Sequence, residues 1–224
     1  MERGTRAELI GRLAQAVGSV AAAHPTRVAV DGPPAAGKTT LADELAAVLR
    51  ARGRDVVRAT IDDFLVPRAR RYRRGEYSAE GCYLDAHDHD ALTRVLLDPL
   101  GPGGDRRFQY AVYDRTADTA LSPPVTTAAA DAVLVFDGVF LLRPELIDRW
   151  DLRVFVSTAL EKTVDRAVLR ERGVSSPADV RRRWRERYLP SQQLYLATVR
   201  PTDLADIIVY NDEPGRPLWQ TRAD

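Results

Sequence analysis

The residues from 32 to 39 have the types and spacing needed to hold a polyphosphate. They read Gly-Pro-Pro-Ala-Ala-Gly-Lys-Thr and match G-x-x-x-x-G-K-[ST], the phosphate-binding loop. In such a loop the backbone N–H groups turn toward phosphate oxygens, Lys38 reaches the β- and γ-phosphates, and the Thr39 hydroxyl holds Mg²⁺. Of the 33 basic residues only Lys38 and Lys162 are lysines, so Lys38 departs from the chain's general use of arginine. We predict a nucleotide site formed by Gly32, Pro33, Pro34, Ala35, Ala36, Gly37, Lys38, Thr39 and Thr40.

The segments on either side of this loop fit the structure that it requires. Residues 27–31 form a short, largely apolar strand, and residues 40–50 carry apolar side chains at helical spacing. Strand, loop and helix therefore follow one another in the order of the phosphate-binding motif, and the positive end of the helix attracts phosphate. The alternative is a glycine turn that only joins a strand to a helix, which gives no reason for the lysine.

A carboxylate ends a second strand, predicted over residues 132–136. This run is almost entirely apolar, as in a central parallel strand covered on both faces, and Asp137-Gly138 follow it. Open α/β sheets bind ligands at the carboxyl ends of their strands, so we expect Asp137 beside Mg²⁺ or its waters. An ordinary Asp-Gly turn is the alternative.

Two more carboxylates end the strand predicted over residues 55–61. The sequence there is Asp62-Asp63-Phe64. One carboxylate could accept the proton of an attacking hydroxyl group while Phe64 shields the site from water. An acidic turn without a catalytic role is the alternative.

A helical hinge is predicted further along the chain. Thr158 and Glu161 have the spacing of a capping box that opens a helix, Gly173 stops that helix, and Ser176 supplies the cap of the next one.

Arginines surround this hinge. Placed over a nucleotide, the hinge would form a lid of about residues 170–180, and guanidinium groups there would stabilise charge on the moving phosphoryl group. We expect Arg170 and Arg172 to act in this way, with Arg172 on the nucleotide. The arginines between 181 and 187 are expected to form a solvated helix face.

Composition limits the class of protein. The 224 residues suffice for a single domain, here with an excursion over about 98–130. A formal net charge of +1 argues against nucleic acid or a membrane surface as partner, and no apolar run approaches the roughly 18 residues of a membrane span. Cys82 is the only cysteine, and the first residues lack the apolar core of a secretory signal, so we expect a cytoplasmic protein. Its partners should be small molecules.

Strands and helices alternate through the rest of the chain. A capping box at Thr5 predicts a helix that ends near His24. We also expect a helix over 88–97, a solvated loop over 67–74 and a strand over 108–113. This order indicates an α/β fold of the P-loop NTPase type, a three-layer sandwich with a mainly parallel central sheet and a helical lid.

Taken together, these motifs resemble the group of P-loop kinases that contains uridine kinase, phosphoribulokinase and pantothenate kinase. The resemblance follows a consistent order from about residue 27 to residue 212. It rests on the phosphate loop, the Asp62-x-Phe64 step, Tyr113-Asp114, the strand end at Asp137 and the arginine-bearing lid. It implies an enzyme that uses ATP and Mg²⁺ to phosphorylate an alcohol group.

The resemblance also implies roles for single residues. Asp62 matches the general base of the group. Asp85 is the best match to an acid that binds ribose hydroxyls, with Asp88 as the alternative. Tyr113 matches a tyrosine that packs near the nucleobase, and Arg170 matches a lid arginine that approaches the acceptor and the phosphates. The implied acceptor-binding residues are Asp62, Phe64, Asp85, Tyr113 and Arg170.

The acceptor itself stays open between several classes. A nucleoside, phosphorylated on its 5′-hydroxyl, is the first hypothesis. Uridine-cytidine kinases have a histidine shortly after the tyrosine, whereas Tyr113 is followed here by Asp114-Arg115-Thr116, and position 137 has aspartate in place of the usual glutamate. The second hypothesis is therefore a related kinase acting on pantothenate, a sugar phosphate or a specialised metabolite, and the third is a non-kinase P-loop NTPase switch. A homo-oligomer and a preference for GTP are also left open.

Overall fold

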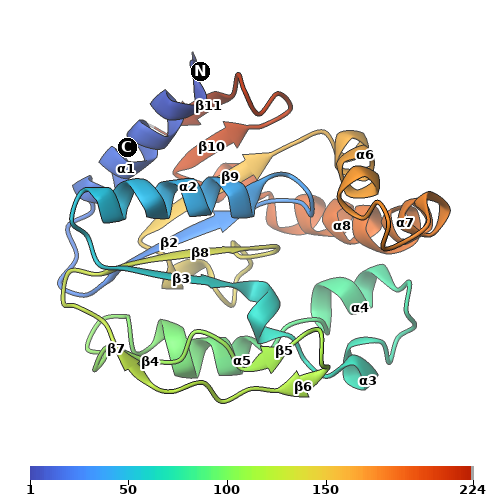
Figure 1. The fold of residues 1–224 in the computed structure, drawn as a ribbon, viewed down its shortest axis with the longest axis horizontal. Helices are drawn as coiled ribbons and strands as arrows, with labels where there is room; N and C mark the ends of the chain where they lie inside the picture. Colours follow the sequence, from blue (N-terminus) through green and yellow to red (C-terminus); the bar gives the residue numbers. More distant parts are fainter. Residues whose placement is uncertain (223–224) are drawn as a thin grey trace.

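The centre of the protein is a seven-stranded sheet, seen in a computed structural model that describes residues 1–222 (Figure 1). The strand order is β1-β11-β10-β9-β2-β8-β3, and the five strands from β10 to β3 run parallel to one another. The strands of the sheet are β1 (Glu2–Arg3), β2 (Thr26–Asp31), β3 (Val56–Thr60), β8 (Val133–Gly138), β9 (Leu152–Ser157), β10 (Ile207–Tyr210) and β11 (Leu218–Thr221).

Helices cover both faces of this sheet, as Figure 1 shows. The α-helices are α1 (Arg6–Ser19), α2 (Lys38–Ala51), α3 (Arg68–Arg71), α4 (Ala79–Leu84), α5 (His89–Leu92), α6 (Leu160–Arg170), α7 (Pro177–Arg183), α8 (Leu189–Val199) and α9 (Pro201–Leu204). Two 3₁₀ turns, η1 (Ile61–Phe64) and η3 (Ile147–Arg149), and two π-helical turns, η2 (Thr93–Leu97) and η4 (Trp184–Tyr188), join them.

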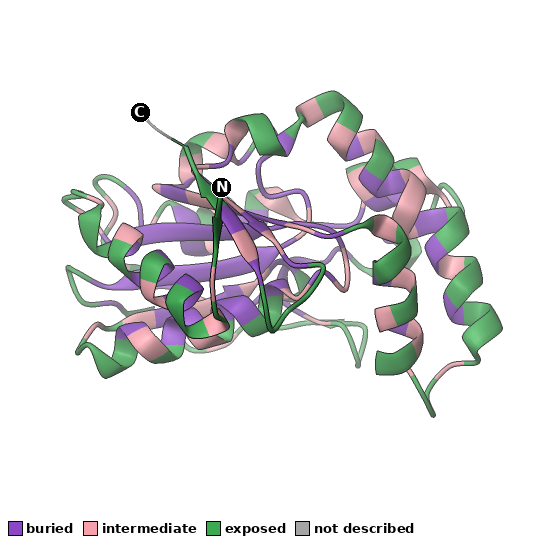
Figure 2. Ribbon diagram, turned by 90° about the horizontal axis from the view of Figure 1, so that it is seen from above, coloured by how far each residue is buried: buried purple, intermediate pink, exposed green. Residues whose placement is uncertain are grey.

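The central strands are buried because each carries apolar residues on both faces. In β2, Val28 and Val30 pack with α1 and α2, whereas Ala29 belongs to the core on the opposite face. Both β2 and β8 are buried along their whole length, and Figure 2 shows purple strands in the interior of the fold. The prediction of central parallel strands from near-continuous apolar runs is therefore confirmed. None of the described helices is both long and apolar enough to cross a membrane.

The helix after Thr5 forms with its capping box complete, but it is shorter than expected. Thr5 accepts the backbone N–H of Glu8, and the Glu8 side chain accepts the N–H of Thr5. The helix ends at Ser19, and the chain then runs through His24 in a bend rather than in a further helical turn. The helix expected over residues 88–97 is confirmed as α5 continued by η2.

The strand expected over 108–113 is wrong as a single element. Two short two-stranded antiparallel sheets take its place: β4 (Arg107–Phe108) pairs with β7 (Thr126–Thr127), and β5 (Tyr113–Asp114) pairs with β6 (Thr119–Ala120). The residues between them bond elsewhere, since the N–H of Gln109 donates to Val95 O and that of Val112 donates to Asp63 O. These bonds attach the segment between β4 and β5 to the η2 and η1 turns.

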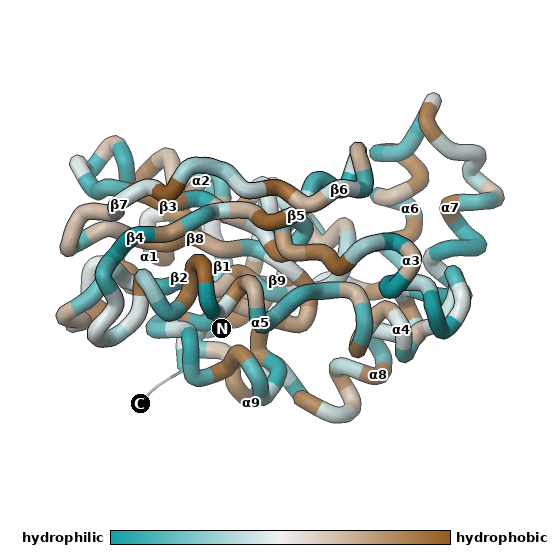
Figure 3. Tube along the Cα trace, turned by 90° about the horizontal axis from the view of Figure 1, so that it is seen from below, coloured by the Kyte–Doolittle hydropathy of each residue, from teal (hydrophilic) through white to brown (hydrophobic). Residues whose placement is uncertain are grey.

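The segment 67–74 is not a solvated loop throughout. It contains the one-turn helix α3, and although the segment is strongly hydrophilic (Figure 3), Arg71 is buried. Its guanidinium carbon lies 5.4 Å from the centre of the Tyr72 ring, and Nη2 lies 3.6 Å from Asp118 Oδ1. An aromatic face and a carboxylate thus replace water around this cation.

The cap expected at Thr158 is also wrong. The N-cap of α6 is Ala159, whose N–H donates to Asp212 Oδ1 at 2.9 Å. Thr158 is buried instead, with Oγ1 3.5 Å from the carbonyl oxygen of Ala36 in the phosphate loop. A contact distant in sequence has therefore replaced the local one.

The arginines between 181 and 187 form a solvated face only in part. Arg181, Arg182 and Arg185 are exposed. Arg187 is buried, donates to the carbonyl oxygens of Glu76 and Ser78, and lies over the Tyr72 ring. This end of the lid region is therefore fastened to the segment between α3 and α4.

Candidate active site

The phosphate loop joins the carboxyl end of β2 to the start of α2. Gly32 and Gly37 have φ values of +148° and +93°, which side chains rarely adopt. A Cβ atom on Gly32 would lie 2.3 Å from Val156 O, and one on Gly37 would lie 2.6 Å from Asn211 Nδ2. Both glycines are therefore required by backbone conformation and by close packing. They allow the backbone to curve around a phosphate group.

Lys38 lies at the end of this loop, where three carboxylates influence its ammonium group. It is buried, and Nζ donates a 2.7 Å hydrogen bond to Pro33 O. Burial lowers the pKa of its ammonium group, while the nearby carboxylates of Asp137, Asp31 and Asp62 oppose that shift. The ammonium group is thus held where phosphate oxygens could replace the carbonyl.

Thr39 and Asp137 meet as expected for a metal site. Thr39 Oγ1 donates to Asp137 Oδ2 at 2.6 Å, and Asp137 is almost fully buried. A hydroxyl and a carboxylate oxygen are suitable Mg²⁺ ligands, and this ion usually takes its remaining ligands from phosphates and water. The two side chains therefore fit the ion that the sequence predicts.

Arg58 is a member of this site that the sequence analysis missed. It extends from β3, donates to Asp137 Oδ1 at 2.7 Å through Nη2, and contacts Asp43 Oδ1 at 2.8 Å through Nε. Its Nη1 also donates to the carbonyl oxygen of Ala59. Arg58 therefore fixes the orientation of the Asp137 carboxylate, and only the pairing of β3 with β8 brings the two side chains together.

The η1 turn places Asp62 and Asp63 in different environments. Asp62 is exposed, and its Oδ2 accepts a hydrogen bond of 3.0 Å from Arg115 Nη1 in the β5–β6 turn. Asp63 is half-buried, and burial raises its pKa, assisted by the charges of Asp62 and Asp137. Phe64 is fully buried, with its ring 6.1 Å from that of Phe136, so it anchors the turn in the core.

The two candidate ribose-binding acids also differ in position. Asp85 accepts hydrogen bonds from Arg73 and Arg74, at 2.9 and 2.6 Å, and the bond from Arg73 is the main cause of its lowered pKa. Asp88 lies beside the η1 turn, since its N–H donates to Phe64 O at 2.7 Å. Its carboxylate accepts the N–H of Ala91 as the cap of α5. The structure therefore places Asp88, rather than Asp85, next to the turn that carries Asp62.

Tyr113 lies close to the same turn. The bond between Val112 N and Asp63 O joins the β5 strand to η1, and the Tyr113 hydroxyl bonds to Asp118. Tyr113 is buried, and Asp118 Oδ1 also lies 3.6 Å from Arg71 Nη2, so a carboxylate links the tyrosine to a buried arginine.

Helix α6 supplies arginines from the lid side. Arg170 is exposed at the carboxyl end of α6, and its positive charge contributes to the lowered pKa of Lys38. Arg172 is exposed and has no ion-pair partner within residues 1–222. Arg166, which the sequence analysis missed, donates to Asn211 O at 2.6 Å and has Nη1 3.5 Å from Ala35 O. It precedes Arg170 by four residues and so shares its helix face, a spacing that could have revealed it.

A buried hydrogen-bond network connects helix α8 to the start of the phosphate loop. Asp31 is fully buried and accepts bonds from the Gly32 N–H at 2.7 Å and from the Tyr195 hydroxyl at 2.5 Å. The Tyr195 hydroxyl in turn accepts the N–H of Leu142 at 3.1 Å. Burial raises the pKa of both Asp31 and Tyr195. Helix α8 is thereby tied to the last residue of β2.

We expect Tyr195→Phe to lower the free energy of unfolding by about 1–3 kcal/mol, because it leaves a buried carboxylate oxygen and the Leu142 N–H without partners. Urea denaturation monitored by circular dichroism would measure the loss. Tyr110→Phe is the control, since Tyr110 is 47% exposed, and it should leave stability unchanged. Equal stabilities for the two variants would contradict the structural role of this network.

Comparison with known proteins shows the family. Residues 27–211 match the Cytidylate kinase-like family. The chain belongs to this family. Family and fold together make it a P-loop kinase, which confirms the resemblance and the α/β fold predicted from the motifs.

Individual relatives extend this result. Uridine-cytidine kinase B of Dictyostelium discoideum is 28% identical over 149 residues, which are 66% of this chain and only 59% of that protein. A solved structure described as a possible uridine kinase from Bacillus stearothermophilus is 25% identical with a TM-score of 0.71, covering 90% of this chain and 97% of the other. D-glycerate 3-kinase from Cryptococcus neoformans shares the fold, with 17% identity, a TM-score of 0.63 and coverage of 91% and 93%.

Proposed function

We propose that this member of the Cytidylate kinase-like family transfers the γ-phosphoryl group of ATP to the 5′-hydroxyl of a nucleoside. One observation carries the proposal: Lys38 and Thr39 follow β2, Asp137 lies near the end of β8, and Asp62 follows β3, so all lie at the carboxyl ends of three neighbouring parallel strands. These are the groups that phosphoryl transfer requires for charge stabilisation, metal binding and proton removal. The similarity to uridine-cytidine kinase B and to the possible uridine kinase favours a nucleoside as acceptor.

Each group has a role that follows from its position. The loop amides and Lys38 would bind the phosphates, and Arg166 and Arg170 would approach them from α6 as part of a lid. Thr39 and Asp137 would hold Mg²⁺, which neutralises charge on the phosphate oxygens when bound. Asp62 would accept the proton of the attacking hydroxyl once that hydroxyl displaces Arg115 from its carboxylate.

An anionic acceptor is the second candidate, and a specific observation favours it. Arg71 and Arg115 lie next to Asp118 and Asp62 respectively, near the residues proposed to bind the acceptor, and no histidine follows Tyr113 in that turn. Guanidinium groups bind carboxylates and phosphates well, which suits pantothenate, a sugar phosphate or a specialised metabolite. Roles for Asp85, Asp88 and Tyr113 in acceptor binding belong to either candidate.

An acceptor screen with magnesium ATP tests the proposal. We expect ADP release to depend on an added alcohol and to be fastest with uridine or cytidine, because the similar proteins are uridine-cytidine kinase B and a possible uridine kinase. The panel should include adenosine, pantothenate, glycerate and ribose 5-phosphate, with 5′-deoxyuridine as the matched control that lacks the reacting hydroxyl. Activity confined to non-nucleosides would select the second candidate, and ATP hydrolysis unaffected by any acceptor would favour a P-loop switch.

A further inference from the structure

A pocket lies at the opposite end of the sheet from the phosphate loop. Its volume is about 380 Å³, within the range of small-molecule sites. It is lined by the start of β2, the turn before β9 and the loop that follows η2. Parallel strands rise about 3.3 Å per residue, so about 17 Å of β2 separate Arg27 in this pocket from Gly32. A ligand bound here is therefore distinct from the nucleotide.

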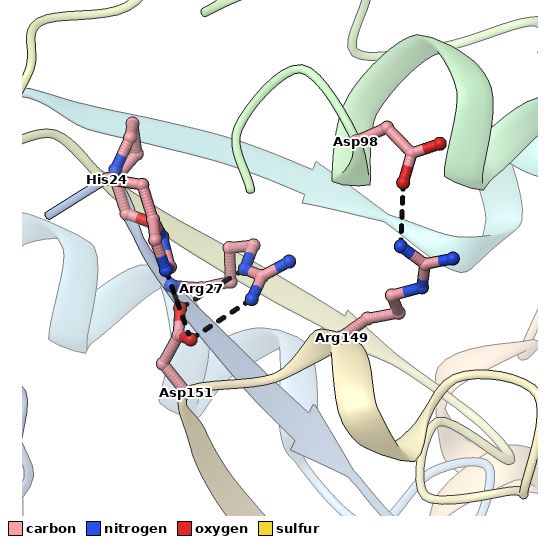
Figure 4. A network of polar contacts seen from close by, with 6 residues as sticks. His24, Arg27, Asp98, Arg149 and Asp151 are labelled. Carbon is pink, nitrogen blue, oxygen red and sulfur yellow. Dashed lines mark hydrogen bonds and ion pairs between the residues drawn. The ribbon is translucent and has the colours of Figure 1, made fainter. Parts of the chain in front are cut away.

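Arg27 is a buried cation that lines this pocket, with one nitrogen next to Gly101, another lining residue. It is 4% exposed, and its Nε and Nη2 both bond to the Asp151 carboxylate at 3.1 Å (Figure 4). Its Nη1 has no partner within residues 1–222, and a Cβ atom on Gly101 would lie only 2.8 Å from it. Asp151 thus fixes the guanidinium group and leaves one donor free beside the glycine loop.

Two more arginines line the pocket. Arg149 donates to Asp98 Oδ1 at 2.7 Å, and Figure 4 shows this pair bridging the turn before β9 and the end of η2. Arg94 is exposed and makes no ion pair with any described residue. Arg27 and Arg149 are therefore held in place by carboxylates, while Arg94 is available to a ligand.

The loop over residues 101–104 adds polar backbone to these side chains. It reads Gly-Pro-Gly-Gly, and its conformation depends on glycine, since Gly103 has a φ of +74° and a Cβ atom on Gly104 would lie 2.2 Å from Pro99 O. The Gly103 N–H has no hydrogen-bond acceptor in the described part of the chain. Glycine allows a ligand to approach such a backbone closely.

The charges define the chemical class of the ligand. Guanidinium groups and a free amide bind phosphate or carboxylate oxygens. The carboxylates of Asp98 and Asp105 also line the pocket, and they disfavour a highly charged anion but accept hydrogen bonds from hydroxyl groups. A hydroxylated molecule with one anionic group would satisfy both the guanidinium and amide donors and the two carboxylate acceptors.

We propose that this pocket binds a small hydroxylated metabolite carrying one phosphate or carboxylate group, at the same time as a nucleotide occupies the phosphate loop. The proposal concerns a site remote from the acceptor and does not depend on which alcohol is phosphorylated.

Calorimetric titration of the full chain tests this. The protein is first saturated with magnesium and a non-hydrolysable ATP analogue, so that the phosphate loop is occupied. Glucose 6-phosphate, gluconate and glucose are then titrated, because they share a carbon skeleton and differ in the anionic group. We expect glucose 6-phosphate or gluconate to bind and glucose to show no binding, and the anion that binds identifies the group preferred.

Variants assign the binding to the pocket. Arg94→Ala removes a side chain without a protein partner, so the fold should be retained, and we expect the Kd of the bound anion to rise about tenfold or more. Arg149→Ala should weaken binding in the same direction. Arg12→Ala is the matched control, because Arg12 is exposed on α1 and bonds only to Gln15 within the described chain. Unchanged Kd values in both pocket variants, or no binding of either anion at millimolar concentration, would overturn the proposal.

Discussion

Replacing Lys38 with alanine is expected to abolish phosphoryl transfer. The ammonium group is the one lysine charge at the phosphate loop, held there by Pro33 O and by nearby carboxylates. Its loss should cost at least the factor of about 10²–10³ in kcat that follows removal of one preorganised donor from a developing charge. Initial rates of ADP formation, measured with saturating ATP and the best acceptor, would report the effect.

The chain provides its own control for this variant. Lys162 is the only other lysine, and it is a half-exposed residue of α6 whose Nζ lies 3.7 Å from Asp212. Lys162→Ala removes the same charge outside the loop and should retain nearly full activity. A Lys38→Ala enzyme as active as Lys162→Ala would refute the assignment of the phosphate loop.

Replacing Asp62 with asparagine is expected to lower kcat by about 10²–10⁴, the usual share of general base catalysis. Asparagine keeps the shape of the side chain and can still accept a hydrogen bond from Arg115, but it cannot take a proton from the acceptor. Affinity for ATP should change little, because Asp62 lies in the η1 turn and not in the phosphate loop. Steady-state kinetics with both substrates varied would separate these effects.

Asp63→Asn is the informative companion to that variant. Asp63 is adjacent to Asp62, yet it is half-buried and its pKa is raised chiefly by burial. If Asp62 is the base, Asp63→Asn should keep a much higher kcat than Asp62→Asn. Normal turnover by Asp62→Asn would remove this residue from the mechanism, and a loss confined to Asp63→Asn would transfer the role to its neighbour.

Local sequence patterns predicted the parts of the site that are local in the chain. The phosphate loop is defined by glycine spacing and by a single lysine, and the central strands are defined by unbroken apolar runs. The position of Asp137 followed from the rule that ligands bind at carboxyl strand ends, and its bond to Thr39 agrees with that expectation. These features need no knowledge of which strands are neighbours.

Residues that depend on tertiary contacts could not be predicted in the same way. Arg58 reaches Asp137 only because β3 pairs with β8, and Arg187 is buried only because α3 and α4 pack against the lid region. Thr158 matched a capping pattern, but a contact with Ala36, over a hundred residues earlier, replaced the local bond. Propensity and residue spacing describe the local structures that a segment can form by itself. Contacts with residues distant in sequence decide which of these structures forms.

A crystal structure with magnesium and a non-hydrolysable ATP analogue would show whether residues 32–39 bind the phosphates of the nucleotide. We expect the β- and γ-phosphates to lie within residues 32–39, with Lys38 Nζ released from Pro33 O to bond to them. We also expect one metal ion contacting Thr39, with Asp137 bonded to it directly or through water. An analogue bound elsewhere, with Lys38 still donating to Pro33 O in a loop that holds no phosphate, would refute the assignment of this loop as the nucleotide site.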